Sequence, residues 1–459
     1  MDQYLFKKYE QNNILLQVSD NVSLSISLQV GDVTTGVTVN STEQGIRTAD
    51  ADLGTVIGAR QLEDLPVKDN NPLLMATLSA GVLDFASSSS GGQTQAFTSS
   101  TPSNISISGV ASSGVNGGNA YTLDGAPNNA GNRNGVGYNE GFIPTTAMVS
   151  EFKIQTATYD ASSGYGPGAN VNLSLKSGAD HLHGQLYETM QNPVLNANSY
   201  FTNRQHDWSA VISGPVILPQ ICNGMSRTFF MYGYNGISNS FPKSTNAVYS
   251  VPTDAERNGD FSALLASGIK IYNPYSTVKD PVNAGHFIRT PFANNVIPFG
   301  SSLNGHQFAM DAYAKYILNT HMPRPNVPGV ADGENNLVLQ QYQTNWYQSH
   351  VVRIDHTLND HHSLFGHFYY SHLDEYDQIR FNRGAGWTYY RDNRGFDVDD
   401  VYTLTPHLVL NTRASVTRYS TSTVPVTEGE DLSATGLSAN YISQISSIDP
   451  GHTRLPDTA

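Results

Sequence analysis

The sequence predicts a mainly β protein, and three observations favour this fold class. Only 14% of the 459 residues are charged, against about 25% in an average soluble protein. Ser, Thr, Asn and Gln supply the polarity beside 40 Gly, 22 Pro and 25 Tyr, a composition that suits strands and turns better than helices. Beyond residue 178, segments of about ten residues alternate apolar with polar side chains. We therefore expect strands throughout and few long helices.

Charge and cysteine content exclude some function classes. The formal charge is −14, from 25 basic and 39 acidic residues, and no basic cluster offers a footprint for nucleic acid. Cys222 is the single cysteine, so no internal disulfide can form. No apolar run reaches the 18 residues of a spanning helix, and Lys7 and Lys8 are not followed by the apolar segment of a signal peptide.

The first predicted element is a set of short strands. Residues 14–39 alternate apolar and polar side chains around the turn Gly31–Asp32. Two or three such strands cannot bury a core alone. We expect residues 1–41 to be the C-terminal remnant of a small β-sandwich.

Residues 42–178 predict a mixed α/β domain. Apolar residues recur at helical spacing over 58–65 and 71–78, with Asn70 or Asn71 as a cap and Pro72 in the first turn. Strands are expected at 105–109, 121–127, 149–156 and 169–176, with Asp124–Gly125 forming a tight turn. The segments 85–103 and 128–141 are rich in Ser, Asn and Gly and predict loops.

Residues 179–459 carry the pattern of an antiparallel transmembrane β-barrel. Apolar residues fall on one face of each strand and charged or polar residues on the other. The apolar face holds Val352, Ile354, Leu358, Leu364, Phe368, Leu408 and Leu410, and the opposite face holds Arg353, Asp355, His367, Asn411 and Arg413.

A long insertion interrupts these strands. Residues 239–345 are rich in Pro, Asn and Gly, and one helix is predicted at 306–318. Periplasmic turns of outer-membrane barrels are short and extracellular loops are long, so we expect an extracellular loop here.

A set of short motifs occurs in a fixed order along the first 184 residues. Its positions are Leu65, Pro66, Gly109, Tyr121, Leu123, Asp124, Gly125, Gly164, Gly166, Lys176, Gly178, His183 and Gly184. This order resembles the plug domain of TonB-dependent outer-membrane receptors, and more narrowly the Oar-like branch, in which a carboxypeptidase-regulatory-like sandwich precedes the plug. The resemblance covers nearly the whole chain.

The resemblance implies a domain plan: sandwich remnant 1–41, plug 42–178, and a partial barrel 179–459 with an extracellular loop at about 239–345. In this family the barrel has 22 strands. At 9–11 residues per strand, residues 179–459 without the loop hold roughly eight to ten. We therefore expect the N-terminal part of a barrel in the outer membrane, from an internal fragment without a signal peptide or a recognisable TonB-contacting segment.

The function that the resemblance implies is active uptake, driven by the TonB, ExbB and ExbD complex, of a siderophore, oligosaccharide, peptide or vitamin complex. Substrate would contact residues 85–103, 128–139 and 241–345, and the barrel would contact lipid. One alternative is a secreted or surface β-rich adhesin or carbohydrate-binding protein, which would carry polar residues at the apolar positions above. Another is a non-functional gene remnant.

Metal and catalytic sites are weaker hypotheses. His181 with His183, or His361 and His362 with His367, could approach one ion, but a third ligand is missing and a structural role is favoured. A calcium loop at Asp124–Gly125 lacks the alternating acidic ligands, and Gly164–Gly168 lacks the Lys of a phosphate loop. We expect no enzyme, cofactor or bound metal.

Overall fold

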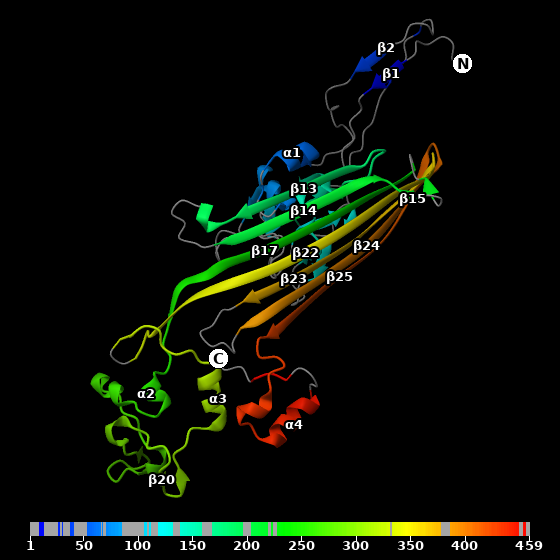
Figure 1. Ribbon diagram of the computed structural model, residues 1–459. Coiled ribbons are helices and arrows are strands. Elements are labelled where there is room, and N and C mark those ends of the chain that lie inside the picture. The colour runs from blue at the N-terminus through cyan, green and yellow to red at the C-terminus, as the bar shows by residue number, and fades with distance from the viewer. Residues whose placement is uncertain are drawn as a thin grey trace.

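The chain forms a large curved sheet, a smaller domain on the concave side of that sheet, and a lobe beyond one of its ends (Figure 1). The computed structural model describes residues 9–12, 26–27, 30, 37–40, 53–65, 67, 70–84, 105–107, 110–111, 118–131, 138–157, 168–195, 203–218, 222–223, 227–330, 333–377, 386–448 and 453–455. The fold is mainly β, as the sequence predicts.

The large sheet, which we call the wall, has seven antiparallel strands that pair in chain order. They are β13 (His183–Gln191), β14 (Arg204–Pro215), β17 (Thr228–Tyr249), β22 (Leu337–Asn359), β23 (His362–Asp377), β24 (Trp387–Thr405) and β25 (Leu408–Pro425). A two-stranded hairpin, β15 (Ile217–Leu218) with β16 (Cys222–Asn223), lies between β14 and β17.

The expectation of eight to ten strands is wrong for the described residues. β22 alone has 23 residues and β17 has 22, about twice the length needed to cross a bilayer. Because each strand is this long, the same number of residues forms fewer strands than predicted. The described residues after β25 form the helices η9 (Leu432–Thr435) and α4 (Ala439–Ile448) and no further strand of the wall. None of the described helices is long and apolar enough to cross a bilayer.

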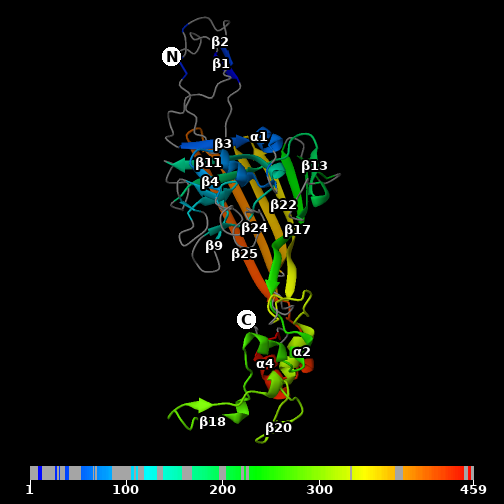
Figure 2. The same ribbon diagram turned by 90° about the vertical axis from the view of Figure 1, so that its left-hand side faces the viewer.

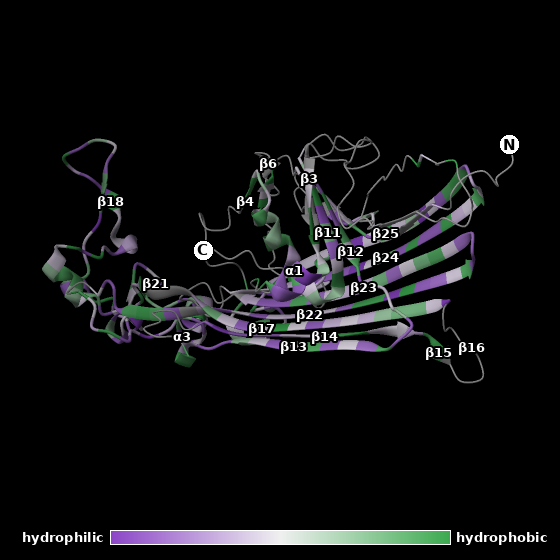
Figure 3. Ribbon diagram, turned by 90° about the horizontal axis from the view of Figure 1, so that it is seen from above, coloured by the Kyte–Doolittle hydropathy of each residue, from purple (hydrophilic) through white to green (hydrophobic). Residues whose placement is uncertain are grey.

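The two faces of the wall differ as predicted. Ile354, Phe368 and Leu408 point outward with 49%, 46% and 54% of their surface exposed. Arg353 and His367 point to the concave face and are largely covered, with side chains 13% and 2% exposed. Alternation with a period of two residues separates the two sets, which is visible as colour stripes along the strands in Figure 3.

The smaller domain, which we call the inner domain, comprises the described residues of 53–178. Its mixed sheet has the order β3-β11-β12-β7-β8, and Figures 2 and 3 show it on the concave side of the wall. The strands are β3 (Leu53–Gly58), β11 (Val149–Ala157), β12 (Asn170–Leu175), β7 (Ala120–Leu123) and β8 (Ala126–Pro127), with smaller sheets of β4 (Val82–Asp84), β5 (Ile105–Ile107) and β6 (Val110–Ala111), and of β9 (Asn129–Gly131) and β10 (Tyr138–Glu140).

The predicted helices of the inner domain are present. α1 spans Ala59–Asp64, and the 3-10 helix η3 spans Pro72–Leu78. The side chain of Asn71 accepts a hydrogen bond from the amide of Leu73 at 3.0 Å, which satisfies one of the free amides at the helix start. A further 3-10 turn, η4 (Thr146–Met148), precedes β11.

One hydrophobic core joins the inner domain to the wall. Phe152 and Ile154 of β11 are fully buried, and wall residues Val211, Met231, Val351 and Tyr369 belong to the same cluster. A Cβ at Gly233 would come within 2.9 Å of Met148. The absence of a side chain at Gly233 therefore lets the inner domain approach the wall closely.

Some predicted features lie outside the described residues: the signature positions Pro66, Gly109, Gly164 and Gly166, and the loop 85–103. Within 1–41 the structure describes a parallel pair, β1 (Tyr9–Asn12) with β2 (Val37–Asn40), and most of the predicted strands at 14–39 are not covered.

The insertion between β17 and β22 is shorter than predicted. It begins later and ends earlier, because each of the two strands extends about ten residues further into the predicted loop. It spans residues 250–336. Its elements are α2 (Asp254–Arg257), η6 (Ser262–Ser267), η7 (Pro274–Ser276), β18 (Val278–Lys279), β19 (Phe287–Ile288), η8 (Ala293–Asn295), β20 (Ser302–Leu303), β21 (His306–Gln307) and α3 (Ala312–Thr320).

The helix predicted at 306–318 starts late. His306 lies in a short hairpin with Leu303, and α3 begins after Asp311, whose side chain accepts hydrogen bonds from the amides of Tyr313 and Ala314. The capping carboxylate fixes the start, which the apolar spacing alone did not reveal. Ile317 of α3 packs with Leu432 and Leu455. We call residues 250–330, 333–336, 426–448 and 453–455 the loop lobe.

Candidate functional site: the seam between inner domain and wall

Asp124 is the centre of the contact between the inner domain and the wall, which we call the seam. It occupies the tight turn between β7 and β8, where φ is 51° at Asp124 and 82° at Gly125. Asp-Gly is favoured in such hairpin turns because both positions require positive φ. Asp124 Oδ1 accepts hydrogen bonds from the amide of Leu175 at 2.9 Å and from Arg353 Nη1 at 2.8 Å.

Arg353 is held between two carboxylates. Besides Asp124, its Nη2 and Nε donate to Asp355 at 2.7 and 3.1 Å. Asp355 also accepts from Ser177 Oγ at 2.8 Å, at the point where the inner domain ends and the chain enters the wall. Charge-assisted hydrogen bonds are stronger than neutral ones, and more so away from water.

The charges continue across the concave face. His367 Nδ1 lies 3.2 Å from Asp124 Oδ2 and 4.0 Å from Asp397 Oδ2, and Asp397 directly opposes His367 in the sheet. Two residue pairs further along, at the next position on the concave face, Arg413 Nε donates to Asp399 at 2.7 Å. We call Arg353, Asp355, His367, Asp397, Asp399 and Arg413 the charged belt.

An aromatic contact and an amide reinforce the seam beside the charged belt. Phe142 of the inner domain stacks on Tyr369 of β23, with ring centroids 4.5 Å apart and planes at 11°. Tyr369 is only 2% exposed. Asn393 Nδ2 donates to the carbonyl of Gly141 at 2.6 Å. Gly395 opposes Tyr369 in the sheet, and a Cβ there would overlap the tyrosine ring.

A second polar contact reaches β14. Asn70 Nδ2 donates to Asp207 Oδ2 at 2.6 Å, while Asn235 of β17 donates to the other oxygen of Asp207 at 2.8 Å. The hydroxyls of Thr145 and Ser209 lie 3.4 Å apart. The inner domain is therefore fixed to strands at both sides of the wall.

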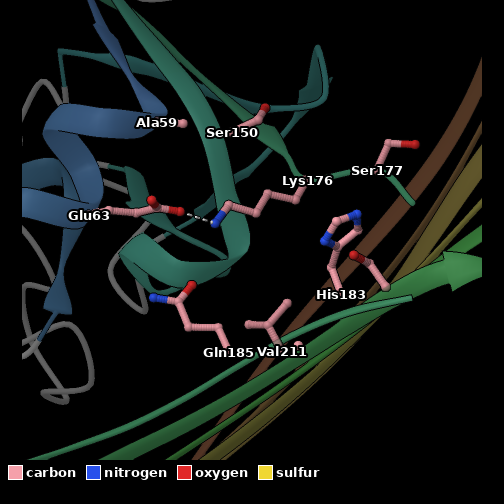
Figure 4. Close-up of a pocket in the computed structure, with 10 residues that line it drawn as sticks. Ala59, Glu63, Ser150, Lys176, Ser177, His183, Gln185 and Val211 are labelled. Carbon is pink, nitrogen blue, oxygen red and sulfur yellow. Dashed lines mark hydrogen bonds and ion pairs between the residues drawn. The ribbon is translucent and has the colours of Figure 1, made fainter. Parts of the chain in front are cut away.

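An open cavity of about 530 Å³ separates the inner domain from the first two wall strands. Figure 4 shows Lys176 reaching toward Glu63 of α1, at 2.8 Å, across from His183 and Gln185 of β13. Ten residues from both sides line it, most of them small or polar. Such a lining suits water and polar solutes better than an apolar ligand.

The signature residues take different roles. Tyr121 and Leu123 are core residues with 1% exposure, and Asp124 and Gly125 form the seam turn. Leu65 ends α1 and is 42% exposed. Lys176, His183 and Gly184 line the cavity. Gly178 lies so close to the wall that a Cβ would come within 2.6 Å of the carbonyl of Gly214.

Sequence reasoning did not single out the charged belt as a site. The sequence does contain a pattern that indicates the charged belt, because charged residues recur at inward positions on four neighbouring strands. What the sequence could not show is the register that places Arg353, His367 and Asp397 in one row.

The histidines considered for metal binding are dispersed. His362 points outward and pairs with Asp400 at 2.5 Å, whereas His367 points into the seam. Side chains on opposite faces of β23 cannot share an ion. His361 lies in the turn after β22, His181 is exposed, and His183 lines the cavity.

The loop lobe contains its own polar cluster. Glu430, which follows β25, accepts hydrogen bonds from Tyr316 Oη and from His321 Nε2, the latter at 2.8 Å. The hydrogen bond to Glu430 raises the pKa of Tyr316 to about 12. Glu430 thus joins the insertion after β17 to the segment after β25.

Replacing Glu430 with Gln should loosen this attachment by about 1.5–3 kcal/mol, since both bonds are made to a charged acceptor. Limited proteolysis should cleave residues 250–336 several-fold faster, with Lys315→Gln on α3 as the control.

The same comparison should depend on pH. Because the pKa of Tyr316 is raised by folding, the contribution of its hydrogen bond to stability is present below pH 10 and is lost as the pH rises toward 12. The difference between wild type and variant should shrink over that range, and equal cleavage at neutral pH would contradict the role of Glu430.

Comparisons with known proteins agree with this architecture. Residues 174–457 match the family model described as an outer membrane beta barrel domain. The match covers more than half of the chain, so the chain belongs to this family, and its place is the outer membrane. No curated protein sequence matches the chain.

Among solved structures, the outer membrane transporter YddB of Escherichia coli has a similar fold, with a TM-score of 0.50 at 10% identity over 82% of this chain and 40% of that one. A structure of the ferric enterobactin receptor of Pseudomonas aeruginosa has a TM-score of 0.41 at 12% identity, over 84% of this chain and 43% of that one. The ferric preacinetobactin receptor BauA of Acinetobacter baumannii gives 0.39 at 9% identity over 82% and 48%. The chain spans less than half the length of these structures.

The connections between the wall strands differ in length at the two ends of the wall. The turns at 360–361 and 406–407 are short and lie at one end, and the loop lobe lies at the other. Because short turns of outer-membrane barrels face the periplasm, we propose that the loop lobe is extracellular.

Proposed function

We propose that this chain is the plug and the N-terminal part of the barrel of a TonB-dependent outer-membrane transporter, with the inner domain as the plug. The observation that carries the proposal is the seam. A small domain with its own sheet lies on the concave face of a barrel wall and is held there by charged and polar contacts and by a shared hydrophobic core.

The partner in this proposal is the TonB, ExbB and ExbD complex, which would pull on the plug from the periplasm. Substrate would meet the loop lobe and the loops at 85–103 and 128–139. We further propose membership of the Oar-like branch, with a carboxypeptidase-regulatory-like sandwich before the plug. Siderophore, oligosaccharide, peptide and vitamin complexes all fit the proposal, which includes no enzymatic step.

The outward face of the wall favours this function over a soluble adhesin or carbohydrate-binding protein. Val352, Ile354, Phe368, Leu408 and Leu410 are 36–54% exposed there. A surface adhesin would place polar side chains at these positions, because exposed apolar bands promote association in water.

Energy-dependent exposure of the seam tests the proposal without knowledge of the substrate. Thr145 is 5% exposed and faces Ser209 across the seam. In a Cys222→Ser background, which removes the single cysteine, Thr145→Cys in the full chain should react with a periplasmic maleimide several-fold faster in energised cells than in cells without TonB. Thr77→Cys, on the exposed end of η3, should react equally in both. Equal rates at Thr145→Cys with and without TonB would refute the proposal.

A further inference from the structure

Two arginines stand side by side on the outward face of the wall. Arg394 of β24 directly opposes Arg418 of β25, and both side chains are exposed. Like charges directly opposite each other destabilise a strand pair. Such a pair is best explained by an anion that neutralises both residues.

The protein does not supply that anion within its described part. None of the ion pairs found there includes Arg394 or Arg418. Asp392, two residues along β24 on the same face, already accepts hydrogen bonds from Tyr370 Oη at 3.1 Å and from His372 Nδ1 at 3.0 Å.

One of the arginines is held in position by an aromatic ring. The guanidinium of Arg394 lies over Tyr370, 5.4 Å from the ring centroid. This contact is a cation–π interaction, and the bond from Tyr370 to Asp392 fixes the ring. Arg394 is therefore oriented without being neutralised, which prepares it to bind a ligand.

The pair stands where the outward face changes from apolar to polar. Toward the periplasm, the outward residues from Phe396 to Leu404 and from Leu408 to Val416 are mostly apolar. The exceptions are Thr412 and the Asp400 opposite it, which pairs with His362. These spans match the 9–11 residues of a strand that crosses hydrocarbon. Toward the loop lobe, the next outward residues are Asp392 and Ser420. The arginines therefore lie at the extracellular edge of the apolar band.

We propose that Arg394 and Arg418 bind a phosphate group on the headgroup of an outer-leaflet lipid. Guanidinium groups present paired donors that match phosphate oxygens, and two of them can share one phosphate. The lipid source follows from position, because acyl chains attached to that headgroup would lie along Phe396 and Val416, which are 52% and 69% exposed. The proposal rests on the outer-membrane location and not on the transport function.

Lipid titration of the full chain tests this site. The protein, purified in a non-ionic detergent and delipidated, is titrated with diphosphorylated lipid A and followed by native mass spectrometry. Arg394→Gln/Arg418→Gln should raise the dissociation constant at least about tenfold, as expected for losing charge-assisted hydrogen bonds. Lys270→Gln/Lys279→Gln removes the same charge from exposed positions of the loop lobe and should change nothing.

Three results would overturn the proposal. If dephosphorylated lipid binds wild type as tightly as diphosphorylated lipid A does, the phosphate is not recognised and only an apolar contact remains. Displacement of the lipid by millimolar inorganic phosphate would assign the site to the free ion. An equal loss in the lysine control would indicate net charge alone. Arg394→Lys/Arg418→Lys keeps the charge but not the paired donors, and should weaken binding by an intermediate amount. If the double Gln variant does not fold, Arg418→Gln alone gives the same comparison.

Discussion

Replacing Asp124 with Asn should detach the inner domain from the wall at lower denaturant concentration than in wild type. Asn has the same shape and tolerates the positive φ of this turn, so the substitution removes charge alone. Arg353 and His367 would then face the seam without their shared carboxylate. Removing one partner of a buried ion pair costs about 3–5 kcal/mol. Two measurements check this result: the rate of amide hydrogen exchange in β7 and β12, and the denaturant concentration at the unfolding midpoint.

The control is another acidic residue in the same domain. Asp64 pairs with Arg60, but the two side chains are 68% and 94% exposed. Water screens such a pair, and Asp64→Asn should leave the midpoint unchanged. A midpoint for Asp124→Asn that equals that of this control would show that Asp124 does not hold the seam.

Truncation of Tyr369 to Ala should have a similarly large effect through a different cause. The ring fills the space between Phe142 and Gly395, so its loss leaves a cavity and an unstacked Phe142. Large-to-small substitutions of buried aromatic residues cost about 3–5 kcal/mol. Thermal unfolding in detergent would measure this loss of stability, and faster protease cleavage within residues 138–157 would show that the inner domain is released.

The matched variant uses the same residue type on the same strand. Tyr376 of β23 is 41% exposed on the outward face, and Tyr376→Ala should leave protease cleavage of the inner domain at the wild-type rate. If both variants release the inner domain equally, the effect belongs to β23 as a whole and not to the stacked pair.

Local patterns predicted much of this fold because they are short-range. Alternation assigned the faces of β22, β23 and β25 correctly, and the Asp124–Gly125 pair predicted a turn that the structure contains. Both signals depend on neighbouring residues alone. The predicted helices at 58–65 and 71–78 followed from local spacing and capping residues in the same way.

Signals that depend on long-range partners failed. The strand number was overestimated because nothing in the alternating pattern says where a strand leaves the membrane. The start of α3 was misplaced because the apolar spacing around His306 belongs to a hairpin with Leu303. The charged belt needed the register of four strands, which single-strand patterns do not contain.

The order of strands in the inner domain has a mechanical consequence. β3 is the first strand of this domain along the chain, and among the described strands it lies at the edge of its sheet, paired with β11 alone. A force applied to the N-terminal end would reach β3 first and separate one strand pair. The turn at Asp124 belongs to the hairpin of β7 and β8, on the far side of β12. Separation of β3 alone would leave the charged seam intact, and only a longer extension would reach the contacts at Asp124.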